Sequence, residues 1–160
     1  MLTPLTLTLA WQLVARLVAL AVTLQTIELL QLHRVAANDG IWRWSTLARD
    51  WSALPRPLGA VVTQLLRARP FVALLVVRLA AALALGLFAL TPWTAPLPAL
   101  LLVTTVLVQL RWRGTFNGGS DFMTLVILTA LTVASWAPPD SRVATGALLY
   151  EIMIQYQNGY

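Results

Sequence analysis

Four ionisable side chains stand inside long apolar runs of this sequence, where a charge is costly unless it is paired or functional. Two are basic, Arg16 and Arg78, and two are acidic, Glu28 and Glu151. In an apolar setting such groups can bind an anion or a lipid headgroup, or they can hold neighbouring helices together by charge-assisted hydrogen bonds. Helix cross-linking is the simplest role, and a polar binding pocket or extension of the arginines to water is the alternative.

Residue counts along the apolar runs indicate which of these charges can meet. A helix rises about 1.5 Å per residue, so Glu28 lies about 7 Å and Arg78 about 12 Å from the same end of the runs. Counted from the opposite end, Arg16 and Glu151 both lie about 13–17 Å deep. The predicted ion pairs are therefore Glu28–Arg78 and Arg16–Glu151. Gln12 stands one helical turn before Arg16 on the same face, so we expect it to join the second pair.

The groups that most often carry out catalysis are scarce in this chain. It contains no Cys, no Lys and a single His, His33. Without Cys there is no thiol nucleophile, no Cys-ligated zinc and no iron–sulfur cluster, and without Lys there is no Schiff base. One His cannot form a two-His metal site within one chain. The sequence therefore offers no candidate catalytic residues and no metal ligands, and leaves a lipid or a quinone as the conceivable bound cofactor.

A short polar loop precedes one of the apolar runs. It contains Asn117, Gly118 and Gly119, followed by Asp121 at the start of the run. Asn and Gly adopt left-handed backbone conformations at low cost, and a carboxylate in the first turn of a helix stabilises its free N–H groups. Capping is the simplest role of Asp121, and a place in a site near the membrane surface is the alternative.

The elements that position these residues are long apolar helices. The chain of 160 residues is 59% apolar and 11% charged, whereas a soluble domain has about 25% charged residues. Its length suffices for four or five membrane spans of about 20 residues each. We predict an all-α fold, a single transmembrane bundle of four spans with a fifth, incomplete helix. The predicted spans cover residues 5–32, 71–90, 97–110, 121–136 and 142–157. The last run is still apolar at Tyr156, so we expect a partial chain, with a re-entrant or surface helix as the alternative.

Residues 33–70 differ from the spans on both sides. They carry six Arg together with Trp42, Trp44 and Trp51. Aromatic rings mixed with Arg suit a segment that lies along lipid headgroups, and residues 59–67 could form a short helix there. Because basic loops stay on the cytoplasmic side, this segment and residues 111–120 are predicted to be cytoplasmic, with the N-terminus outside a bacterial inner membrane. The same placement explains the net charge of +5 without nucleic acid as a partner.

Three stretches resemble a known family of membrane proteins. Residues 115–123, Thr-Phe-Asn-Gly-Gly-Ser-Asp-Phe-Met, are similar to the Asn-Gly-Gly-Asp turn of bacterial members of the horizontally transferred transmembrane (HTTM) family. That family includes vitamin K-dependent gamma-carboxylase-like proteins and is often compared with DoxX-like four-helix membrane proteins. Residues 13–17 and 38–44 look like the family's opening, and residues 149–160 resemble the start of its next helix. The resemblance implies a helical membrane protein with a redox-linked role, and carboxylase activity is not carried over.

Two classes of function follow from these observations. The first is a non-catalytic accessory or scaffold subunit, or the membrane module of a larger assembly, with membrane lipids and other membrane subunits as partners. The second is a membrane enzyme of the HTTM or DoxX type that acts on a lipid or quinone, with Gln12, Arg16 and Glu151 lining its pocket. A small transporter is a third class, but the sequence has no inverted repeat to support it. The scarcity of acid–base groups favours the first class.

Overall fold

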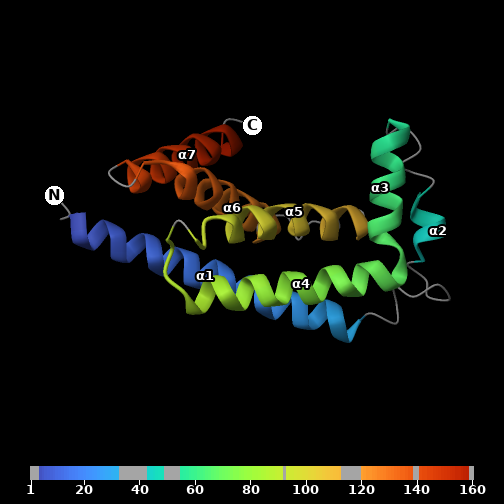
Figure 1. Ribbon diagram of the computed structural model, residues 1–160. Coiled ribbons are helices and arrows are strands. Elements are labelled where there is room, and N and C mark those ends of the chain that lie inside the picture. The colour runs from blue at the N-terminus through green and yellow to red at the C-terminus, as the bar shows by residue number, and fades with distance from the viewer. Residues whose placement is uncertain are drawn as a thin grey trace.

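The computed structural model describes residues 4–32, 43–48, 55–91, 93–112, 120–138 and 141–158, and every regular element within these ranges is a helix. In Figure 1, α1 and α4 lie side by side, α5 runs along α4, and α6 and α7 gather at the far end. The helices are α1 (Pro4–Gln31), α2 (Trp44–Leu47), α3 (Arg56–Leu66), α4 (Ala68–Leu87), α5 (Pro96–Arg111), α6 (Ser120–Trp136) and α7 (Arg142–Asn158). The prediction of an all-α fold is confirmed.

The boundaries of the long helices follow local signals in the sequence. Each of the five predicted apolar helices matches an observed one to within three residues at either end. Pro96 opens α5 because a proline is well tolerated in the first turn of a helix. The turn before it is closed by Thr94, whose hydroxyl accepts a hydrogen bond from the Thr91 N–H at 2.8 Å and donates one to the Ala89 carbonyl at 2.9 Å.

Two of the described helices are long and apolar enough to cross a membrane. They are the Leu9–Gln31 part of α1 and the whole of α4. Two further apolar helices are shorter, Pro96–Arg111 and Phe122–Trp136. By length and composition the structure therefore supports two spans, whereas four are predicted from the sequence.

Small side chains bring α1 and α4 into close contact along most of α4. Ala15, Ala19 and Val22 of α1 are buried against Ala82 and neighbouring residues of α4. A Cβ placed on Gly86 of α4 would lie 3.6 Å from the Cβ of Ala19, which is an ordinary contact distance. Side chains of this size allow two helix backbones to approach closely, as they do in membrane bundles.

A second core joins the short helices to one end of this bundle. Trp44 and Leu47 of α2 and Leu66 of α3 pack with Phe71 of α4 and Val108 of α5. Trp44 is only 5% exposed, so its ring belongs to the core of this end, and its position at headgroup level stays a prediction. Trp42 and Trp51, which were predicted to anchor with it, lie outside the described residues. Figure 1 shows α3 standing across the ends of α4 and α5.

Candidate functional site

Arg78 forms a polar link between three helices. It lies in the middle of α4 and is fully buried. Its Nη2 donates to Oε1 of Gln25 in α1 at 2.6 Å and to Oγ1 of Thr105 in α5 at 3.3 Å. Hydrogen bonds from a charged donor contribute about 1.5–3 kcal/mol each. The Arg78 link therefore holds α1, α4 and α5 together through an arginine, an amide and a hydroxyl.

The predicted partner of Arg78 was Glu28, which the structure places elsewhere. Glu28 is exposed on α1, and the described contacts include no ion pair between its carboxylate and Arg78. Gln25 stands three residues before Glu28 and is the side chain that turns inward. The predicted depth gives the correct level of α1, but the face of the helix decides which residue reaches Arg78. Gln25 and Thr105 are uncharged, so a prediction based on opposite charges does not identify them as partners.

The second predicted pair, Arg16 with Glu151, does not meet either. Arg16 is exposed in a shallow groove of about 250 Å³, where it lies with Gly86 and Leu87 at the end of α4. Glu151 is exposed on α7, and its Oε1 accepts a hydrogen bond from Nε2 of Gln155 at 3.3 Å. The expected pair is absent from the ion pairs of the described residues. The prediction failed because the depth of Arg16 was counted from the start of α1.

Gln12 shows why that count fails. Its Oε1 accepts a hydrogen bond from the backbone N–H of Leu90 at 3.3 Å, just beyond the end of α4. Together with the contact between Gln25 and Arg78, this fixes an antiparallel register in which α1 begins well beyond the end of α4. Arg16 is therefore level with the end of α4 and not with the middle of the bundle. Gln12 satisfies a free N–H of the following turn and does not join a charge network with Glu151.

The loop that precedes α6 lies mostly outside the described residues. This applies to Asn117, Gly118 and Gly119, and also to His33 of the earlier segment. Asp121 falls in the first turn of α6, which begins at Ser120. The predicted start of a helix at this point is confirmed, while the capping role of the Asp121 carboxylate stays a prediction.

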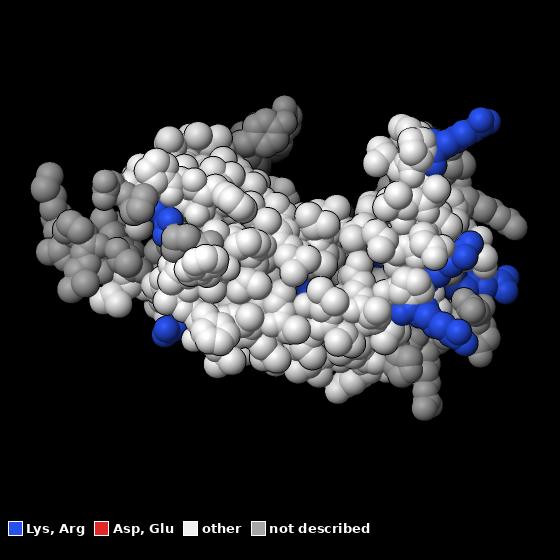
Figure 2. Space-filling view, in the orientation of Figure 1, with Lys and Arg blue, Asp and Glu red and all other residues white. Residues whose placement is uncertain are grey.

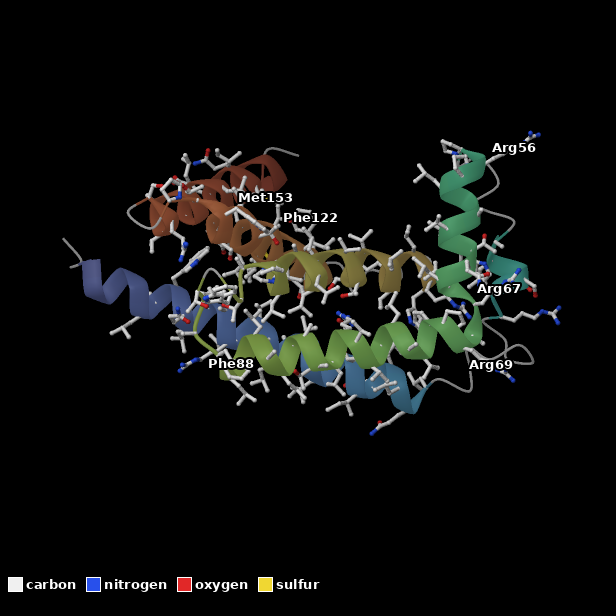
Figure 3. All side chains as sticks on the ribbon, viewed as in Figure 1. Arg56, Arg67, Arg69, Phe88, Phe122 and Met153 are labelled. Atoms are coloured by element: carbon white, nitrogen blue, oxygen red, sulfur yellow. The ribbon has the colours of Figure 1, made fainter. Side chains whose placement is uncertain are left out.

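Exposed arginines gather at the end of the bundle where α3 stands. They are Arg43 before α2, Arg56 at the start of α3, Arg67 between α3 and α4, and Arg69 in the first turn of α4. We call this set the basic end. Figure 2 shows its blue side chains projecting from one side of the molecule, and Figure 3 places Arg56, Arg67 and Arg69 at the end opposite Phe88. Most of the exposed arginines that the structure describes thus gather at one end of the folded chain, while Arg16 lies at the other.

An open cavity of about 720 Å³ lies within the basic end, between α2, α3 and the start of α4. We call it the arginine cavity. Its lining includes Trp44, Ser45, Thr63, Gln64, Arg67 and Arg69. It therefore combines two guanidinium groups with two hydroxyls and an amide, and none of its described lining residues is acidic.

A buried cation stands behind one wall of this cavity. Arg111, the last residue of α5, is fully buried. Its Cζ lies 5.8 Å from the ring centroid of Trp44 and 5.5 Å from that of Phe71, within the range of cation–π attraction. From the sequence, Arg111 is expected only to add to the positive charge of the predicted cytoplasmic segment 111–120. The aromatic partners come from segments distant in the sequence, so no local pattern could reveal the contact.

Comparison of the chain with protein-family models, with curated proteins and with solved structures finds no match. The resemblance to the HTTM family therefore stays an expectation from the sequence. Among the described residues, no group of three or more His, Cys, Asp or Glu is placed to hold a metal ion.

Proposed function

We propose that this chain is a multi-pass, non-catalytic membrane module that serves as an accessory or scaffold part of a larger assembly. In this proposal α1, α4, α5 and α6 cross the bilayer, and the basic end lies at the cytoplasmic surface. Membrane lipids and other membrane subunits are its partners.

The placement of this chain in a membrane is supported by α1, where the large apolar side chains face outward and the small ones face inward. Leucines face outward, whereas the inner face is built from Ala and Val that are at most 4% exposed. A soluble helix places its large apolar residues inside, and an exposed apolar surface of this extent is typical of contact with lipid or another protein. The outward residues are Leu9, Leu13, Leu17, Leu20 and Leu24, each between 55% and 61% exposed.

The shorter helices fit a bilayer when they are considered together with their neighbours. The α5 and α6 helices have 16 and 17 residues, or about 24–26 Å at 1.5 Å per residue. The hydrocarbon core is about 30 Å thick. Local thinning of the bilayer and polar residues that extend to the interface compensate a mismatch of this size at a modest cost. Both helices pack beside α4 or each other, which supports their inclusion as spans.

The amphipathic helix α3 supports the orientation. It lies across the bundle end (Figure 1) and leaves Leu58 and Val61 each 57% exposed beside an arginine-rich surface. A helix with an apolar face and nearby Arg side chains is suited to lie in the plane of the headgroups. At the opposite end, Trp93 is 94% exposed in the turn before α5, as expected for an aromatic residue at the other membrane interface.

The absence of Cys from the sequence makes a topology test direct. We expect Ala89→Cys, in the turn after α4, to react with a membrane-impermeant maleimide on intact cells. Ser45→Cys, at the basic end, should react only after the cells are permeabilised. Extraction at alkaline pH should leave the protein in the membrane pellet. Release of the protein by alkali, or equal labelling of both variants on intact cells, would contradict the membrane proposal.

The role as a module of an assembly is supported by the chemistry of the Arg78 link. An arginine held by an amide and a hydroxyl cross-links helices, whereas acid–base catalysis requires a group that titrates near neutral pH. We expect the chain, solubilised from its native membrane in a mild detergent, to migrate in a complex larger than its own 17.5 kDa. Migration as a monomer alone would overturn the assembly role and leave the topology result unaffected.

A further inference from the structure

We propose that the arginine cavity binds the headgroup of an anionic phospholipid that carries free hydroxyl groups, of which phosphatidylglycerol is an example. The inference rests on the proposed function, because a membrane orientation brings the cavity to the headgroup layer. It goes beyond general attraction between basic residues and a membrane, since it assigns the binding to one cavity and to one class of lipid.

The arginines of the cavity supply the recognition of phosphate. Arg67 and Arg69 are two residues apart, at the junction of α3 and α4, and both line the cavity. A guanidinium group donates two parallel hydrogen bonds to phosphate oxygens, which makes Arg a better phosphate ligand than a simple point charge. A phosphodiester seated between the two side chains would accept hydrogen bonds from both. The described lining contains no carboxylate to compete for them.

The uncharged polar side chains of the cavity indicate the rest of the headgroup. Ser45 comes from α2, and Thr63 and Gln64 come from α3. Their hydroxyl and amide groups can donate hydrogen bonds to headgroup hydroxyls and accept hydrogen bonds from them. A choline headgroup has no hydroxyl and carries a positive charge, so it fits neither these groups nor the arginines. The cavity volume of about 720 Å³ is within the range of small-molecule sites.

Arg111 packs behind the cavity wall and adds to the positive potential of the cavity. It is shielded from water and lies against the Trp44 ring that forms part of the lining. A buried charge is screened by salt much less than an exposed one. The wall is also anchored in the second core, where Trp44 packs with Leu66 and Phe71. The site therefore has a packed aromatic side and a solvent-exposed arginine side.

The test measures lipid binding to the purified full chain in detergent by native mass spectrometry. The probes are phosphatidylglycerol and phosphatidylcholine with identical acyl chains. We expect phosphatidylglycerol to bind at least about tenfold more tightly, and the double variant Arg67→Gln with Arg69→Gln to lose about tenfold or more of that affinity. The matched control is Arg43→Gln with Arg56→Gln, which removes the same charge from exposed positions outside the cavity and should change the affinity by less than about twofold.

A second variant keeps the test independent of any folding defect in the first. Gln64 is exposed on α3 and lines the cavity, so Gln64→Glu should fold normally while its carboxylate repels the phosphate and weakens binding of phosphatidylglycerol by about tenfold. Unchanged affinity in Gln64→Glu would overturn the proposal. Equal losses in the cavity variant and the matched control would show general charge attraction and would also overturn it, without affecting the topology result.

The final arm separates a lipid from a soluble phosphate compound. Glycerol 3-phosphate and inorganic phosphate are added at millimolar concentration to the complex with phosphatidylglycerol. We expect no displacement, because the lipid shares the micelle with the protein and is held at a high effective concentration, whereas a soluble phosphate competes from bulk water. Displacement by either compound would assign the cavity to a soluble phosphate and overturn the lipid assignment.

Discussion

At the scale of single residues, the decisive feature is which side chain of α1 reaches the buried arginine of α4. Gln25 and Glu28 are three residues apart, and only Gln25 points into the bundle. A carboxylate opposite Arg78 would form a buried ion pair, whose cost of desolvation can exceed its attraction. An amide supplies a hydrogen bond without a second charge to be desolvated. The Arg78 link thus gives directional contacts among three helices at a lower cost in buried charge.

This arrangement predicts opposite outcomes for two similar substitutions on α1. Gln25→Leu removes the 2.6 Å hydrogen bond to Arg78 and should lower the free energy of unfolding by about 1.5–3 kcal/mol. Glu28→Gln changes an exposed side chain and should alter the same quantity by less than about 0.5 kcal/mol. Thermal unfolding of the detergent-solubilised chain, followed by circular dichroism, measures both. A larger loss from Glu28→Gln than from Gln25→Leu would restore the ion pair predicted from the sequence.

At the scale of helices, the sequence predicts where each element lies better than how the elements are aligned. Pro96 and Pro138 punctuate the apolar runs, so the ends of the helices around them are encoded locally. Alignment depends on contacts between distant segments, and Gln12 with Leu90 shows that α1 extends beyond α4. A depth counted along α1 alone therefore places Arg16 too far inside. The arginine cavity was missed for the same reason, because three helices must meet before it exists.

Substitution of two glycines by alanine tests this packing of helices, because opposite effects on stability are expected at the two positions. A Cβ on Gly146 of α7 would press against the indole of Trp11 and lie 3.0 Å from the Cβ of Ala134, whereas a Cβ on Gly86 has ordinary room beside Ala19. We expect Gly146→Ala to destabilise the fold by about 1–3 kcal/mol through overpacking. Gly86→Ala should be neutral or stabilising by up to about 1 kcal/mol, because alanine is the better helix former.

The double variant Gly146→Ala with Trp11→Leu provides the control for that pair. It removes the ring that the new methyl group would meet, so part of the lost stability should return relative to Trp11→Leu alone. Thermal unfolding in detergent, with the same protocol for all variants, gives the comparison. If Gly146→Ala were tolerated as well as Gly86→Ala, the contact between α1 and α7 would be looser than the structure indicates.

At the scale of the whole molecule, the distribution of charge and apolar surface sets an axis for the chain. The basic end, with the arginine cavity and α3, lies opposite Phe88 and the turn before α5 (Figure 3). The surface between these ends includes the outward leucines of α1 and exposed valines of α4, such as Val76 and Val77. An arginine-rich end beside an apolar girdle is the arrangement that the proposed membrane orientation requires. A membrane enzyme that acts on a lipid or quinone would have the same axis. Contact with lipid therefore does not distinguish such an enzyme from a non-catalytic membrane module.

The same apolar girdle yields a prediction that distinguishes a membrane bundle from a water-soluble helical protein. Leu20 lies near the middle of the apolar part of α1 and is 55% exposed. On a water-exposed surface, Leu20→Asp would change stability by less than about 0.5 kcal/mol. At the centre of a membrane span it should cost about 3–4 kcal/mol of insertion free energy, because a favourable side chain is replaced by a charged one.

The measurement is the fraction of protein that resists alkaline extraction from membranes. Ala89→Asp, in the exposed turn outside the proposed span, is the control and should insert normally. Full retention of Leu20→Asp in the membrane pellet would mean that this face of α1 meets water or a polar partner and not lipid.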